Sequence, residues 1–177
     1  MVNVNKTEYE FQKETFESFC KLYQFKFPQE FIDYLSIHND AELEPNIVSI
    51  GDNECCIRYF YGTSKDVCSD ICIMYKEYQK RLPEKCIPIA DPDFGNQICI
   101  SLSEDTYGKI YFWDHETMDP DVDDVCEITL DNMLEIAGSF NELLDCIKES
   151  SYVMQVVSKP SFFENMVQYI KVNLLKK

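Results

Sequence analysis

Glycine and histidine are both scarce in this chain. Its 177 residues include five glycines, which leaves little material for a Gly-rich phosphate loop, and no G-x-S-x-G nucleophile elbow occurs. The only two histidines, His38 and His115, provide few ligands for the zinc ion of a hydrolase. No apolar run approaches the ~18–20 residues that a membrane span needs. The opening "MVNVNKTEYEFQKE" lacks the basic segment and apolar stretch of a secretory signal, so we expect none.

Regularly spaced cysteines are also missing, although the chain holds nine. An odd number without regular spacing argues against a disulfide framework. Several cysteines lie within apolar runs such as "CIPIA" and "ICISL", where a free thiol behaves as a small hydrophobic group. Cys68 and Cys72 have the i, i+4 spacing of helical neighbours and not that of a zinc or redox pair. We therefore expect a reducing compartment, the cytoplasm.

Basic residues are outnumbered two to one: 16 Lys and Arg stand against 32 Asp and Glu, for a net charge of −16. The segment 91–135 holds thirteen acids and one base, Lys109, and so carries −12 of that charge. Direct binding to nucleic acid is disfavoured, because phosphates are neutralised by clustered Lys and Arg. Two interpretations remain open, a solvated acidic surface and a docking surface for a basic protein.

Apolar spacing and capping residues predict helices over 8–23, from Pro28 to Asn39, after Ser64 or Asp66 up to Pro83, after Ser139, and after Ser161. Both of the last two begin with a capping-box pattern, Ser139 with Glu142 and Ser161 with Glu164. In the third helix we expect Val67, Ile71 and Tyr78 to share one face.

Short strands are predicted over Asn46–Ile50, Cys55–Tyr61, Cys86–Ala90, Gln97–Leu102, Lys109–Trp113 and 125–130. Gly108 lies between two of them and indicates a hairpin. Segment 151–159 suits either a strand or a linker to the last helix. The pattern as a whole predicts a single α+β domain over 1–177, with a mostly antiparallel central sheet flanked by helices.

The acidic loops do not match a metal site. Asp119, Asp121 and Asp123 occupy the first ligand positions of a calcium loop, but Asp124 replaces its glycine and Leu130 its bidentate glutamate. The loop "DPDFGN" offers Asp91, Asp93 and Asn96 without a fourth ligand, and "HETMD" lacks the second histidine of a zinc helix. We expect no metal and no cofactor.

Catalytic pairings are weakly indicated. A Cys–His pair through His115, or an acid–base pair from Asp93, Asp114 and Glu116, stays open because partners meet in space, yet carboxylates are too common here to be informative. We therefore predict that the chain is not an enzyme.

Two longer stretches carry a resemblance, "CIPIADPDFGNQICISLSEDTYGKIYFWDHE" and "LEIAGSFNELLDCI". Together with "FPQEFIDYL" they resemble the Smi1/Knr4 family of the SUKH superfamily over about 28–148. The matching positions are Ile87, Pro88, Ile89, Ala90, Asp91, Gly95, Asn96, Ile100, Leu102, Gly108, Ile110, Tyr111, Trp113, Asp114, His115, Glu116, Ala137, Ser139, Phe140 and Leu144. Two departures are "HND" at 38–40, where the family often has Gly-Gly, and Pro92 and Phe94 in a loop that is often Gly-rich.

The resemblance implies a Smi1/Knr4-like domain with an N-terminal helix, an extra C-terminal helix and no catalytic role. Bacterial members resemble immunity proteins that bind and block a polymorphic toxin, commonly a nuclease, whereas fungal relatives act as regulatory scaffolds. We favour a cytoplasmic immunity protein, as a monomer or weak homodimer, with a basic toxin as partner and no direct contact with nucleic acid or membrane. A regulatory scaffold and a metal-dependent enzyme using the acidic loops are the alternatives.

We expect the toxin to be covered by an acidic edge with a few aromatic residues. The predicted contact residues are Asp91, Asp93, Phe94, Asn96, Asp114 and Glu116, and the predicted steering residues are Asp119, Asp121, Asp123 and Asp124. Asn96 and Asp114 are suited equally to contacting a partner and to forming hydrogen bonds with backbone groups at strand ends. Trp113 is suited equally to the core and to anchoring a partner.

Overall fold

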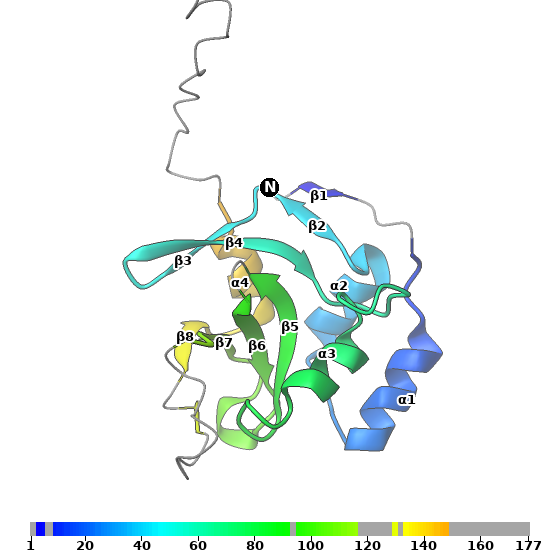
Figure 1. Cartoon of the computed structure of the whole chain (residues 1–177). Helices are drawn as coiled ribbons and strands as arrows, with labels where there is room; N and C mark the ends of the chain where they lie inside the picture. The colour runs from blue at the N-terminus through cyan, green and yellow to red at the C-terminus, as the bar shows by residue number, and fades with distance from the viewer. Residues whose placement is uncertain (1–2, 6–8, 93–94, 117–128, 131–132, 149–177) are drawn as a thin grey trace, which may run out of the picture.

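The chain folds as an α+β protein in which helices pack around a six-stranded antiparallel sheet (Figure 1). The computed structural model describes residues 3–5, 9–92, 95–116, 129–130 and 133–148. The sheet is a meander in the order β3-β4-β5-β6-β7-β8, and a separate pair joins β1 to β2. The strands are β1 Asn3–Asn5, β2 Glu42–Glu44, β3 Ile47–Ile50, β4 Asn53–Phe60, β5 Cys86–Pro92, β6 Gln97–Ser101, β7 Ile110–Trp113 and β8 Leu134–Ala137.

The sheet curls until its two edge strands, β3 and β8, approach each other, so that it is nearly a closed barrel. The outer edge of β3 is also covered: Ile47 and Lys148 exchange two main-chain hydrogen bonds of 3.1 and 2.9 Å. An edge strand covered in this way does not offer its backbone to other chains.

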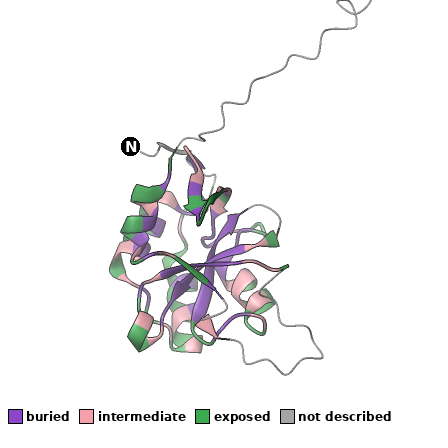
Figure 2. Cartoon of the chain, turned by 90° about the vertical axis from the view of Figure 1, so that its left-hand side faces the viewer, coloured by how far each residue is buried: buried purple, intermediate pink, exposed green. Residues whose placement is uncertain are grey.

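Four helices are described, α1 Lys13–Tyr23, α2 Gln29–His38, α3 Ile71–Tyr78 and α4 Phe140–Cys146. Helices α2 and α4 meet through aromatic rings, with the Phe31 and Phe140 centroids 5.0 Å apart and Phe60 of β4 5.4 Å from Phe140. These rings share one core with the apolar residues of β5 and β6. Every residue of β5, β6 and β7 is buried, so the central strands form a rigid unit (Figure 2).

The third helix begins later than predicted. Its N-cap is Asp70, whose carboxylate accepts the Ile73 N–H at 3.0 Å, and neither Ser64 nor Asp66 caps it. Main-chain bonds from Gly62 to Ser69 and from Ile71 to Gly62 hold the intervening residues in a loop. Val67, predicted to share a helix face with Ile71 and Tyr78, is therefore outside the helix and exposed. The helical spacing of apolar residues extends N-terminally beyond the helix into this loop. The loop is held by hydrogen bonds to Gly62, which the local sequence does not reveal.

The remaining predicted elements agree with the structure in part. The hairpin at Gly108 and the Ser139 cap are confirmed, and Gly108 has φ 83°. The sequence did not reveal β1, β2 or β8, and the first helix begins at Lys13 and not at Glu8. Of the strand predicted over 125–130, residues 125–128 lie outside the described residues, and Thr129 and Leu130 are not in a strand. Segment 151–159 and the helix after Ser161 also lie outside the described residues. Within the described part, no helix has the length and apolar character to cross a membrane.

Candidate functional site

One end of the sheet gathers most of the predicted contact residues that the structure describes. Because neighbouring strands run antiparallel, the last residues of β5 and β7 lie beside the first residue of β6, with Gln97 paired in register with Trp113. Asp91, Asn96 and Asp114 therefore meet at this end, although they are far apart in sequence. Asp93, Phe94, Asp119, Asp121, Asp123 and Asp124 lie outside the described residues.

Asn96 joins the turn before β6 to the residues that follow β7. Its side-chain oxygen accepts the His115 backbone N–H at 3.1 Å and lies 3.0 Å from Nδ1 of the same residue. Gly95 has φ 81°, a backbone conformation that side-chain-bearing residues rarely adopt, and a Cβ there would be in ordinary contact with the His115 ring at 3.7 Å. Asn96 thus fixes the shape of this end of the sheet.

Asp114 and Glu116 form a short turn after β7. The Asp114 carboxylate accepts the Glu116 N–H at 3.0 Å, the bond expected of an Asx turn. Asp114 is half-buried and Glu116 is exposed. Asn96 and Asp114 therefore both accept hydrogen bonds from backbone N–H groups, which is one of the two roles predicted for them. Glu116 faces solvent.

Asp91 is a buried carboxylate and pairs with a cation. Its Oδ2 lies 2.5 Å from Nη2 of Arg58, and the two side chains are 8% and 52% exposed. Arg58 lies on β4, next to the end of β5 that carries Asp91. A partner at this point meets the guanidinium of Arg58, since Asp91 lies beneath it.

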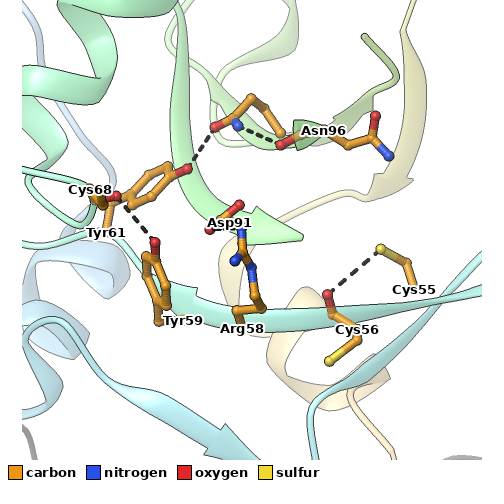
Figure 3. Close-up of polar contacts among 9 residues, drawn as sticks. Cys55, Cys56, Arg58, Tyr59, Tyr61, Cys68, Asp91 and Asn96 are labelled. Carbon is orange, nitrogen blue, oxygen red and sulfur yellow. Dashed lines mark hydrogen bonds and ion pairs between the residues drawn. The ribbon is translucent and has the colours of Figure 1, made fainter. Parts of the chain in front are cut away.

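Tyrosines extend this ion pair across the sheet (Figure 3). The guanidinium of Arg58 lies 5.9 Å from the ring centre of Tyr59, and the Tyr59 and Tyr61 rings are 6.0 Å apart. The Tyr61 hydroxyl donates to Oε1 of buried Gln97 at 2.9 Å, and the Gln97 amide donates to the Asn96 carbonyl. Burial, and after it the charge of Asp91, raises the pKa of Tyr61, so this phenol stays neutral.

A second arginine completes the arrangement. The guanidinium of Arg81, which follows α3, lies 4.8 Å from the Trp113 ring centre and 5.5 Å from that of Tyr78. Tyr78 meets Trp113 edge-on at 5.7 Å. Trp113 is 1% exposed and its Nε1 has no hydrogen-bond partner in the described chain, so it belongs to the core and the other residues cover it.

We call this set the arginine–aromatic row: Arg58, Tyr59, Tyr61, Trp113, Tyr78 and Arg81. Gln97, whose side chain accepts from the Tyr61 hydroxyl, is paired in register with Trp113, and this pairing links the two halves of the row. Arg58 and Arg81 are the only arginines in the sequence. Of these six residues, only Trp113 was considered from the sequence as an anchor for a partner, with the core as the alternative, and it lies in the core. The scarcity of arginine is the one feature of the sequence that distinguishes Arg58 and Arg81.

The acids of segment 91–135 that the structure describes do not form one surface. Glu104 and Asp105 lie in the turn between β6 and β7, at the opposite end of the sheet from Asp91. Glu135 pairs with Lys109 at 2.9 Å. The described acidity is therefore divided between the two ends of the sheet and one ion pair.

No group of three His, Cys, Asp or Glu within the described ranges is arranged to hold a metal ion. Asp91, one of the predicted loop ligands, has Arg58 against its carboxylate. The possible calcium loop at Asp119–Asp123 lies outside those ranges.

The SMI1 / KNR4 family (SUKH-1) model matches residues 11–146, which include α1 as well as the expected core. A Bacillus subtilis (strain 168) protein, "SPbeta prophage-derived uncharacterized protein YokK", is 33% identical over 113 residues. That alignment covers 64% of this chain and 52% of the relative, so the chain spans about half the length of that protein. Since the family model covers most of the chain, from α1 to α4, this protein belongs to the SMI1/KNR4 (SUKH-1) family.

Proposed function

We propose that this chain is an immunity protein, which binds a cognate polymorphic toxin and neutralises it by covering the toxin's basic active surface. The resemblance to bacterial members of the family implies this role, and the family match supports it. The toxin is proposed to be a nuclease, because an enzyme that grips phosphate groups needs a basic cleft that an acidic protein can fill.

The observation that carries the proposal is the convergence of acid-bearing turns on one end of a rigid sheet. The turns after β5 and after β7 both start there, and Asn96 and His115 tie them together. Because β5, β6 and β7 are buried throughout, they hold this end in place before any partner arrives. A preformed surface loses less conformational entropy on binding.

Charge gives the proposed mechanism its second part. A net charge of −16 attracts a basic toxin over long range, and such attraction raises association rates by about 10–10³-fold at low salt. Glu116 and Asp114 would contact the toxin at the sheet end, while Asp119, Asp121, Asp123 and Asp124 would act mainly by steering.

The test uses the toxin domain encoded beside the gene for this protein. We expect tight binding, loss of the toxin's activity in the complex, and an association rate that falls steeply between low and high salt. Reversing the charges of Asp121, Asp123 and Asp124 together should slow association about tenfold or more and leave the melting temperature nearly unchanged.

Reversal of Glu104 and Asp105 provides the control, because these two acids lie at the end of the sheet opposite Asp91 and their reversal changes the charge by four units, against six in the triple variant. This control variant should associate nearly as fast as the unaltered protein. Equal slowing by both variants would show that only net charge matters and not the proposed end of the sheet. Binding without loss of toxin activity would favour a regulatory scaffold instead.

A further inference from the structure

We propose that His115 is a specificity-determining contact at the sheet end, where its Nε2 accepts a hydrogen bond from a basic side chain of the toxin. This inference rests on the proposed function and adds a neutral, directional contact to the acidic residues named there. Asn96 prepares the imidazole for that contact, because it determines which of the two ring nitrogens carries the hydrogen.

The hydrogen bonds of Asn96 fix the orientation of its own side-chain amide. The backbone N–H of His115 can only donate, and it bonds to Oδ1 of Asn96 at 3.1 Å. The amide oxygen, and not the amide nitrogen, therefore faces His115, because a nitrogen there would place two donors against each other. The same oxygen lies 3.0 Å from Nδ1 of the His115 ring.

This arrangement selects one tautomer of His115. An amide oxygen only accepts, so the hydrogen between the two side chains belongs to Nδ1 of the imidazole. In a neutral imidazole, the other nitrogen, Nε2, then carries a lone pair and no hydrogen. His115 therefore offers a hydrogen-bond acceptor at Nε2.

The Nε2 atom is accessible to a partner. Among the described residues it has no hydrogen-bond partner, and it is not one of the buried polar atoms that lack one, so it reaches the surface. The ring itself is half-buried, and Asn96 holds it through two hydrogen bonds. A ring held in this way loses little conformational freedom when a partner binds.

The chemistry of this position fits a cationic donor. The Nε2 lone pair lies in the plane of the ring, and the exposed carboxylate of Glu116 follows next in the chain. Both groups accept hydrogen bonds, and arginine and lysine are the side chains that combine several N–H donors with a positive charge. A toxin carboxylate placed here would find no donor on either group and would lose its hydrogen bonds to water.

Such a contact adds selectivity that exposed acids do not supply. An ionised carboxylate attracts cations from many directions, whereas Nε2 of His115 accepts along one direction, which Asn96 holds fixed. Long-range attraction acts mainly on the association rate, and a short directional contact acts mainly on the dissociation rate. His115 should therefore prolong the complex with the cognate toxin and have little effect on how quickly that complex forms.

The tautomer is tested on the full-length protein without the toxin. Long-range proton–nitrogen NMR spectra of the histidine rings, recorded at about pH 8 where a free imidazole is mostly neutral, distinguish hydrogen on Nδ1 from hydrogen on Nε2. His38→Asn assigns the signals, because the chain has two histidines. We expect hydrogen on Nδ1 of His115. Asn96→Asp, which keeps an accepting oxygen, should retain this preference and Asn96→Ala should lose it; hydrogen on Nε2 in the unaltered protein would overturn the inference.

The contact is tested by the rates of binding to the toxin domain encoded beside the gene, also at about pH 8. His115→Asn keeps an N–H donor near the position of Nδ1 and removes Nε2. We expect it to raise the dissociation rate about tenfold or more and to leave the association rate nearly unchanged. His115→Gln, whose longer side chain brings an amide oxygen near the position of Nε2, should lose less. His38→Asn, at a half-buried histidine of α2, is the matched control and should change neither rate.

A double-mutant cycle identifies the toxin group. Each Arg and Lys of the toxin domain is changed to Ala and combined with His115→Asn, and we expect a coupling of about tenfold with one of them. Melting curves verify that His115→Asn remains folded. An unaltered dissociation rate in this variant, or no coupling with any basic toxin residue, would overturn the inference while leaving the proposed function intact. A toxin domain that does not bind the unaltered protein would overturn both.

Discussion

Asn39 joins three segments of the chain through one side chain. Its Oδ1 accepts the Thr63 N–H at 2.8 Å, and its amide donates to the carbonyls of Tyr9 and Thr63 at 3.2 and 3.1 Å. Asp40, next in sequence, adopts φ 52°. This explains how "HND" replaces the Gly-Gly often found in the family: Asn39 links the end of α2 to the N-terminal segment and to the loop after β4.

Gly62 is the residue that makes room for this junction. A Cβ on Gly62 would lie 2.3 Å from Oδ1 of Asn39 and 2.7 Å from the Asp40 nitrogen, too close for either to remain in place. We expect Gly62→Ala to lower the free energy of unfolding by roughly 3 kcal/mol or more, because the clash involves backbone as well as a buried side chain. Urea denaturation followed by circular dichroism measures this change.

Gly51→Ala is the matched control for that substitution. No atom lies within 4 Å of a Cβ at Gly51, but its φ of 58° makes alanine strained, so we expect a loss of about 1 kcal/mol. Similar losses at the two glycines would contradict the close packing of Gly62 against Asn39.

At the scale of secondary structure, the local sequence was sufficient to predict an element where the hydrogen bonds that form it are also local. Ser139 was predicted to cap a helix, and its Oγ accepts the Glu142 N–H at 3.1 Å. The first N–H of α4 is also satisfied, but by Glu30 of α2 at 3.0 Å, across 110 positions in sequence. No pattern around Ser139 reveals this second bond, because it depends on how α2 and α4 pack.

The cap at Ser139 gives a prediction for α4. We expect Ser139→Ala to lower the free energy of unfolding by about 1 kcal/mol, because the Glu142 N–H loses its acceptor. Ser139→Asp should retain most of that stability, since aspartate is an equally good capping residue. Thermal and urea denaturation of the two variants provide the comparison; an aspartate variant as unstable as the alanine variant would argue against the cap.

In the candidate site, too, local features could be predicted from the sequence and long-range contacts could not. Strand ends could be read from the sequence, so Asp91, Asn96 and Asp114 could be assigned to one edge before their positions were known. The partner of Asp91 could not, because Arg58 lies 33 positions away on a strand whose pairing with β5 contains an irregularity. Asp91, which we predict to lie at the contact edge, also forms an ion pair with Arg58.

At the scale of the whole molecule, many phenols and thiols are buried without charge. Burial raises the pKa of the Cys72 thiol to about 12 and that of Cys20 to about 11, from 9.0, and also raises the pKa values of Tyr34 and Tyr61 above 10.0. The unfolded chain releases these protons near pH 9–10, whereas the folded chain keeps them to higher pH. Folding is therefore favoured fully below pH 9 and progressively less as pH rises above it.

We accordingly expect the melting temperature to fall as pH increases from 9 to 10.5, after a region of little change between pH 7 and 9. Differential scanning calorimetry at constant ionic strength measures the trend. Replacing the exposed Cys68 and Cys146 by serine should leave the slope unaltered, because these thiols are exposed. A melting temperature that is flat or rises over the alkaline range would contradict the neutral burial of these groups.

The complete burial of β5, β6 and β7 has an evolutionary consequence. Substitutions within these strands disturb the interior and are selected against through stability, whereas those in the turns at the sheet end alter only the surface that a partner meets. Such a fold can accept changes at exposed turn positions such as Glu116 without loss of its core.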